Sequence, residues 1–138
     1  MKTLRVTLPL PPGVNNQYVT VGRRRVLGKE AKAFKIQAAS VIRGLLIDDP
    51  DAEAMVATLS DTPFACDFVF YFETPFKRDL DGGLKIALDA LGESLGIDDR
   101  YAVSLTLEKR IDPLNPRLEV ELGPLPDWRF DEEYVVLE

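Results

Sequence analysis

Alternating apolar and polar positions predict four β-strands along the chain. The first covers Thr3 to Leu10, and the clearest covers Phe64 to Glu73, where every second residue from Phe64 is a phenylalanine or Cys66. Two further strands are predicted around Val103 to Leu107 and Leu118 to Leu122. A period of two places alternate side chains on one face of a sheet, so one face of each strand is expected to join a core.

Two other stretches have apolar residues at the three- and four-residue spacing of an amphipathic helix. The first helix is predicted to begin at Lys29, and the second is predicted to follow Asp81 and to end at Gly96, a residue type that often terminates helices. The apolar stripe of the first comprises Phe34, Ala38, Val41 and Leu45, and that of the second comprises Leu84, Leu88, Leu91 and Leu95.

The remaining segments are predicted to be connections. Gly13 to Gly28 is expected to form an irregular loop or a short hairpin, and Asp48 to Pro63 a loop with about one helical turn within Ala52 to Leu59. The order strand, helix, strand, helix, strand, strand predicts an α/β or α+β fold, with a single mixed β-sheet of about four strands and two main helices packed on it. We expect one domain over residues 1–122, followed by an acidic C-terminal tail over residues 123–138.

The composition narrows the chemistry. The chain has no histidine and one cysteine, Cys66, so it lacks the residues for Ser-His or Cys-His mechanisms, for common zinc sites and for a disulfide framework. A reducing cytoplasm is the expected setting. No stretch is long and apolar enough to span a bilayer, so no membrane partner is expected. Carboxylates and lysines are therefore the remaining candidate groups for catalysing hydrolysis. Carboxylate oxygens are suitable ligands for hard cations such as Mg²⁺ or Mn²⁺.

Charge is segregated along the chain, although the net charge is -6. Residues 1–46 contain nine basic residues and one acidic residue, whereas residues 111–138 contain two basic and eight acidic residues. A polyanion responds to the local field of a basic patch more than to the total charge. The alternative interpretation of these basic residues is an ordinary solvated surface without a DNA partner. The candidate DNA-binding residues are Arg23, Arg24, Arg25, Lys29, Lys32, Lys77 and Arg78.

Acidic residues flank the second predicted helix. Asp79 and Asp81 stand two residues apart before it, and alternate side chains of an extended stretch point the same way, so both can face one cation. Asp81 is also expected at the N-cap, and a plain helix cap is the alternative reading of this residue. Lys85 follows one turn later, where its ammonium can approach a phosphate. Asp98 and Asp99 follow the far end of the helix, where the dipole disfavours negative charge; a solvated turn is the alternative there.

Together these residues resemble the signature of the RusA family of Holliday junction resolvases, in which an R-D-x-D motif opens a helix and an Asp-Asp pair follows it. The motif here reads Arg78-Asp79-Leu80-Asp81, with Lys85 in the helix and Ile97-Asp98-Asp99 after it. The opening, Thr7 to Pro12 followed by Asn15-Asn16, is also similar to that of the family. One departure is Gly82, where the family often has asparagine; the acidic residues are intact.

The resemblance implies a RusA-like fold and a Mg²⁺-dependent, structure-selective endonuclease that resolves four-way junctions by paired symmetric nicks. It implies a homodimer acting on branched DNA, with Mn²⁺ as a substitute metal and no organic cofactor. The implied metal ligands are Asp79, Asp81 and Asp99, with Asp98 as an open alternative, and Lys85 completes the implied catalytic set. Two other classes stay open: a catalytically silent junction-binding protein of the same fold, and an acidic adaptor that binds another protein.

Overall fold

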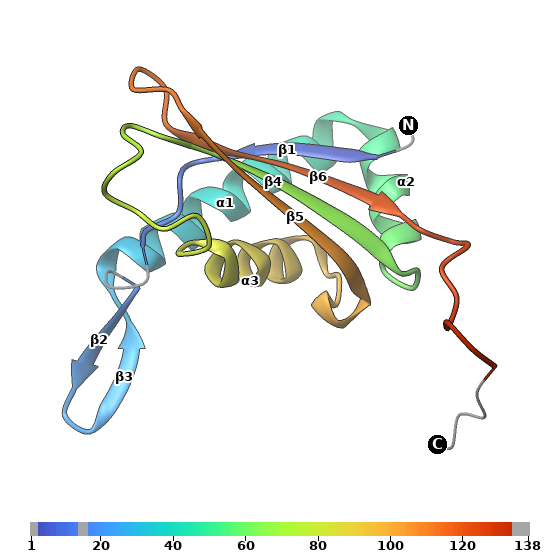
Figure 1. Ribbon diagram of the computed structural model, residues 1–138, viewed down its shortest axis with the longest axis horizontal. Coiled ribbons are helices and arrows are strands. Elements are labelled where there is room, and N and C mark those ends of the chain that lie inside the picture. Colours follow the sequence, from blue (N-terminus) through green and yellow to red (C-terminus); the bar gives the residue numbers. More distant parts are fainter. Residues whose placement is uncertain (1–2, 14–16, 134–138) are drawn as a thin grey trace.

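The computed structural model describes residues 3–13 and 17–133. Its centre is a four-stranded mixed sheet in the order β1-β6-β4-β5, in which β4 and β5 are parallel and β6 is antiparallel to both β1 and β4 (Figure 1). The strands are β1 (Leu4–Leu8), β4 (Phe64–Phe72), β5 (Ala102–Ile111) and β6 (Arg117–Pro124). The helices are α1 (Lys29–Asp48), α2 (Pro50–Leu59) and α3 (Leu84–Leu95). The predicted α+β architecture with one mixed sheet of about four strands is confirmed.

The core lies between the helices and one face of this sheet. Phe64, Phe68 and Phe70 of β4 are fully buried, whereas Asp67 on the opposite face is exposed. Burying each large aromatic side chain contributes on the order of 1.5–3 kcal/mol. Because β1 and β6 show the same alternation of buried and more exposed positions, the helices cover one face of the sheet and leave the other to solvent.

The segment predicted to be a loop with one helical turn instead forms the ten-residue helix α2. Two residues mark its start. Asp49 caps it, since the Asp49 side chain accepts hydrogen bonds from the backbone N–H groups of Asp51 and Ala52, and Pro50 occupies the first helical position. The expectation of two main helices is therefore wrong by one: a third helix packs beside α1 and against β1 and β6.

The other two helices differ from the prediction in phase and in starting point. The predicted apolar face of α1 includes Val41, but Val41 is 40% exposed. The next residue, Ile42, is buried in its place. Helix α3 begins at Leu84 with Gly83 at its N-cap, and its end at Gly96, with φ of 71°, is as predicted. Among the described residues, no helix has the length and apolar character needed to cross a membrane.

A two-stranded hairpin projects from the body of the molecule (Figure 1). It consists of β2 (Tyr18–Val21) and β3 (Arg24–Leu27), joined by a two-residue turn at Gly22 and Arg23. Gly22 has a φ of 63°, which favours glycine at the first position of such a turn. The structure thus selects the hairpin among the predicted alternatives. We call this hairpin, residues 18–27, the arm.

Candidate active site

The R-D-x-D motif lies on the connection between β4 and α3. We call residues 77–83 the acidic loop. Its Asp79 and Asp81 are both exposed, and neither side chain makes a hydrogen bond or ion pair with the described part of the chain. The expectation that Asp81 caps the helix is wrong, because α3 begins three residues later and Gly83 provides no side-chain cap. Asp81 contributes its backbone carbonyl instead, which accepts a hydrogen bond from the N–H of Leu84 at 3.1 Å. Both carboxylates therefore remain available to a ligand.

Side chains from distant parts of the sequence hold the backbone of this loop. Gln17 is buried, and its side-chain amide donates hydrogen bonds to the carbonyls of Pro12 at 3.0 Å and Gly82 at 2.8 Å. Lys109 of β5 donates from Nζ to the carbonyl of Arg78 at 2.8 Å. Neither Gln17 nor Lys109 was singled out from the sequence, and nothing in the local sequence indicates these contacts.

Arg78 contributes to the same anchoring. Its guanidinium donates a hydrogen bond to the carbonyl of Pro11 and lies 5.1 Å from the ring centroid of Phe72. Burial lowers the pKa of Arg78 from its ordinary value. Gly83 packs closely against Pro11, to which Arg78 is bonded: a Cβ at position 83 would lie 2.6 Å from Cγ of Pro11, so only glycine fits. These contacts give Arg78 a structural role, and its contact with DNA stays a prediction.

Lys85 is the second residue of α3 and directly follows the acidic loop. Its side chain is 77% exposed, and its Nζ lies 3.6 Å from the carboxylate of Asp89, four residues along the helix. Exposed pairs of this kind contribute little to stability. The Lys85 ammonium can therefore leave Asp89 for a stronger anionic partner such as a phosphate.

The second acidic pair lies beyond the other end of α3. Asp98 Oδ1 accepts a hydrogen bond from the backbone N–H of Arg100 at 2.9 Å, and Oδ2 accepts from Nε and Nη2 of the same residue at 2.9 and 2.7 Å. These hydrogen bonds, the side-chain one first, lower the pKa of Asp98 from its ordinary value. Asp99 begins the short 3₁₀ helix η2 (Asp99–Tyr101), and its exposed side chain makes no hydrogen bond with described residues. Of this pair, Asp99 is the carboxylate that is not already engaged.

The two acidic pairs are separated within one chain. Helix α3 has 12 residues, which corresponds to a length of about 18 Å, with the acidic loop at one end and η2 at the other (Figure 1). Across the described ranges, no group of three or more Asp, Glu or Cys side chains is arranged to hold a metal ion. The structure thus brings Asp79 and Asp81 onto one loop and does not bring Asp99 to them.

The predicted basic residues lie on the arm, on α1 and on the acidic loop. Arg23, Arg24 and Arg25 are exposed on the arm, Lys29 and Lys32 are exposed on the first turns of α1, and Lys77 is exposed on the acidic loop itself. The Arg25 guanidinium lies 5.1 Å from the ring centroid of Tyr18. Since Gln17 directly precedes β2 and contacts Gly82, the base of the arm adjoins the acidic loop. Asn15 and Asn16 of the family-like opening lie outside the described residues.

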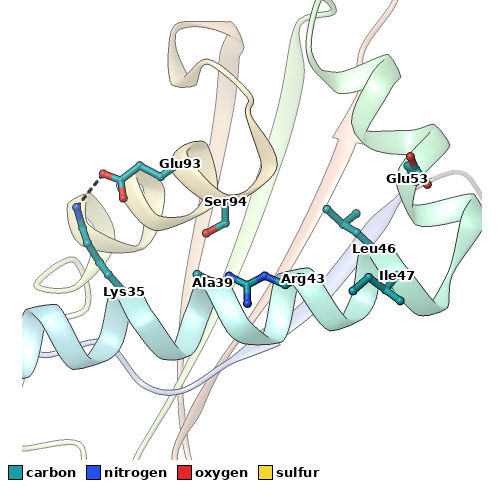
Figure 2. Close-up of a pocket in the computed structure, with 8 residues that line it drawn as sticks. All are labelled: Lys35, Ala39, Arg43, Leu46, Ile47, Glu53, Glu93 and Ser94. Carbon is teal, nitrogen blue, oxygen red and sulfur yellow. Dashed lines mark hydrogen bonds and ion pairs between the residues drawn. The ribbon is translucent and has the colours of Figure 1, made fainter.

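Two further features contain none of the predicted site residues. A groove of about 660 Å³ lies between α1, α2 and α3, where Arg43 and Leu46 line its floor and Lys35 is held by Glu93 at 2.9 Å (Figure 2). Cys66 is buried in β4, and desolvation, with a smaller contribution from the charge of Asp67, raises the pKa of its thiol to about 12. Cys66 therefore stays protonated at neutral pH and is unsuited to be a nucleophile.

Comparison with known proteins supports the resemblance carried by the central motif. No family model matches the chain. The chain is 28% identical over 124 residues to the crossover junction endodeoxyribonuclease rusA of Enterobacteria phage 82, an alignment that covers 88% of this chain and 95% of that protein. This similarity over most of both chains supports the resemblance to the RusA family that the R-D-x-D and Asp-Asp motifs indicated.

Proposed function

We propose that this chain is a Mg²⁺-dependent, structure-selective DNA endonuclease that resolves four-way junctions by paired symmetric nicks. The observation that carries the proposal is the acidic loop: its two exposed carboxylates make no hydrogen bond or ion pair with described residues, while its backbone is held firmly beside a basic arm. The phage relative, named a crossover junction endodeoxyribonuclease, supports this activity at the level of the family.

Asp79 and Asp81 fit a hard divalent cation. Carboxylate oxygens are the ligands that Mg²⁺ prefers, and Mg²⁺ is commonly bound by one or two carboxylates together with substrate phosphate and water. When bound, the cation lowers the pKa of a coordinated water and offsets charge on the scissile phosphate. Lys85, the second residue of α3, pairs weakly with Asp89, so its ammonium can turn toward a phosphate at the same loop and stabilise the negative charge that develops there.

The basic residues supply affinity for branched DNA. Arg23, Arg24 and Arg25 on the arm, Lys29 and Lys32 on α1, and Lys77 on the acidic loop are exposed and can each neutralise a phosphate. Such contacts carry little sequence information, which suits an enzyme that selects the shape of its substrate. Arg78 contributes indirectly, because its side chain anchors the acidic loop to the carbonyl of Pro11.

The separation of the two acidic pairs supports a homodimer. Asp81 and Asp99 lie at opposite ends of α3, so in this proposal the third ligand, Asp99, comes from a second copy. In a two-fold symmetric dimer with antiparallel α3 helices, the beginning of each helix meets the end of the other. This arrangement creates two equivalent sites, as two symmetric cuts require.

A cleavage assay tests the proposal. The purified protein is incubated with a four-way junction and with linear duplex of the same sequence, in Mg²⁺, Mn²⁺ or EDTA. We expect paired nicks in the junction only, with either metal and not in EDTA. Junction binding without cleavage would identify a silent junction-binding protein, and neither binding nor cleavage would favour an acidic adaptor.

A further inference from the structure

We propose that Gln17 and Lys109 are positioning residues that fix the acidic loop from both sides. This inference rests on the proposed function, because it assigns to these two side chains the task of holding Asp79 and Asp81 in a geometry that binds metal.

The two contacts bracket the motif. Lys109 donates to the carbonyl of Arg78, the residue before Asp79, and Gln17 donates to the carbonyl of Gly82, the residue after Asp81. The peptide groups on either side of the Asp-Leu-Asp segment are thus held by side chains from β5 and from the base of the arm. The two carboxylates themselves take no part in this anchoring, which leaves them open to a cation.

Gln17 is itself held in place. Its side chain is 4% exposed, and both N–H groups of its amide are used, one on Pro12 and one on Gly82. Its backbone carbonyl accepts the N–H of Gly28 at 2.9 Å, which closes the base of the arm. A buried amide without these partners would be destabilised, so the contact between Gln17 and Gly82 is strongly favoured in the folded state.

The loop needs such anchoring because its own sequence provides little. Gly82 and Gly83 follow Asp81 directly, and glycine has more backbone freedom than any other residue. Lys109 is likewise fixed, since its Nζ also lies 3.3 Å from the carbonyl of Pro75 and 5.4 Å from the ring centroid of Phe72. The rigid sheet and the arm therefore impose on the loop a conformation that its local sequence does not dictate.

Replacement of each anchor by methionine tests the inference. Gln17→Met and Lys109→Met keep an unbranched side chain of similar length and remove the N–H donors. Gln37→Met is the matched control, since Gln37 is exposed on α1. For both anchor variants we expect kcat on junction DNA to fall by about 10- to 100-fold, in line with the effect of small misplacements. The KM for the junction should stay near that of the wild type, and more Mg²⁺ should be needed for half-maximal cleavage.

Hydrogen–deuterium exchange provides a readout that does not depend on cleavage. Without metal or DNA, exchange at the N–H groups of Gly82 and Leu84, which bond to Asp79 and Asp81, should be faster in the two anchor variants than in Gln37→Met. Unchanged exchange together with a wild-type kcat would overturn the inference. A lower melting temperature with a normal kcat per folded molecule would also overturn it, because the residues would then serve only stability. If Gln17→Met does not fold, the result for Lys109→Met decides whether the loop is anchored as proposed. If the wild type does not cleave, the proposed function fails, and the exchange data still decide the anchoring.

Discussion

The two ends of α3 both carry a pair of aspartates, yet they are built in opposite ways. At the beginning of the helix, Asp79 and Asp81 make no hydrogen bonds to described residues through their side chains, and the loop backbone is fixed from afar, by Gln17 and Lys109. At the end of the helix, Asp98 is engaged by Arg100 within the same turn. The first end thus has two unengaged carboxylates on an anchored loop, and the second has one, Asp99.

The helix dipole explains part of this difference. The beginning of α3 has a partial positive charge, which stabilises nearby carboxylates without any basic partner. Its end has a partial negative charge, so two adjacent aspartates there are unfavourable, and the guanidinium of Arg100 offsets one of them. The charged segments of the chain also lie apart. The base of the basic arm adjoins the beginning of α3, and the acidic tail leaves β6 on the opposite side of the molecule from the arm (Figure 1).

The largest effect is expected at the first end. Asp81→Asn and Asp79→Asn should lower the rate of junction cleavage by about 100-fold or more, because a neutral amide is a poor ligand for Mg²⁺. Neither carboxylate caps α3, so the fold should survive. Junction binding should be equal or tighter, since a negative charge is removed next to phosphate. Asp61→Asn, an exposed aspartate after α2, is the control. A folded Asp81→Asn protein that cuts at the wild-type rate would place the site elsewhere.

Mixed dimers test whether the two ends meet across a dimer. Asp81→Asn and Asp99→Asn should each be inactive alone. If each site combines the first end of one copy with the second end of the other, a heterodimer of the two variants has one site with both changes and one intact site. Mixing after partial denaturation and refolding should therefore restore single nicks, measured as nicked junction strands. Complete inactivity of a verified heterodimer would mean that each site is formed within one chain.

A moderate effect on affinity is expected from the arm. Replacing Arg23, Arg24 and Arg25 by alanine should weaken junction binding, because all three are exposed and available to phosphate. The plot of log K against log salt concentration should become shallower by about 0.9 for each phosphate that the arm no longer neutralises. Mobility-shift titrations at several salt concentrations measure both quantities. An unchanged slope would show that the arm does not contact phosphate.

A smaller effect should come from the acidic tail. Gly123 and Pro124 belong to β6, and the N–H of Leu125 bonds to the carbonyl of Pro63, so a clean truncation begins at Pro126. This deletion should tighten junction binding at low salt, because it removes negative charge, and the gain should shrink as salt screens the field. Equal or weaker binding would indicate that Trp128 and Phe130, whose rings pack edge to face, give the tail a structural role.

The smallest effect is expected for Asp98→Asn. The pKa of Asp98 is lowered in the folded protein, so its charge stabilises the fold above the unfolded pKa, about 3.9, and this contribution disappears as the pH falls through the folded value. The difference in melting temperature between wild type and variant should be small at neutral pH, begin to decrease at about pH 4 and vanish below the folded pKa. Cleavage should be largely retained. Loss of cleavage equal to that of Asp99→Asn would add Asp98 to the metal ligands.

The sequence by itself determined the elements whose local signals are strong. The phenylalanine alternation of β4 is visible over nine residues, and the left-handed Gly96 ends α3 where the pattern predicts. The aspartates of the candidate site were also evident, because their spacing around a helix is a local property. The acidic, proline-containing composition of residues 48–63 favours a loop, although Asp49 and Pro50 are good start signals for the helix α2 that forms there. Its apolar face is short, and packing beside α1 stabilises it.

Only the tertiary structure decided how the site is held and what it still lacks. The contact of Gln17 with Gly82 spans 65 residues and that of Lys109 with Arg78 spans 31, so no local pattern contains them. These contacts accompany the close approach of Gly83 to Pro11, and α3 begins at Leu84 instead of directly after a cap on Asp81. Packing likewise placed Ile42 instead of Val41 on the buried face of α1. The separation of Asp81 from Asp99 follows from the rigidity of α3, since a straight helix keeps its two ends apart.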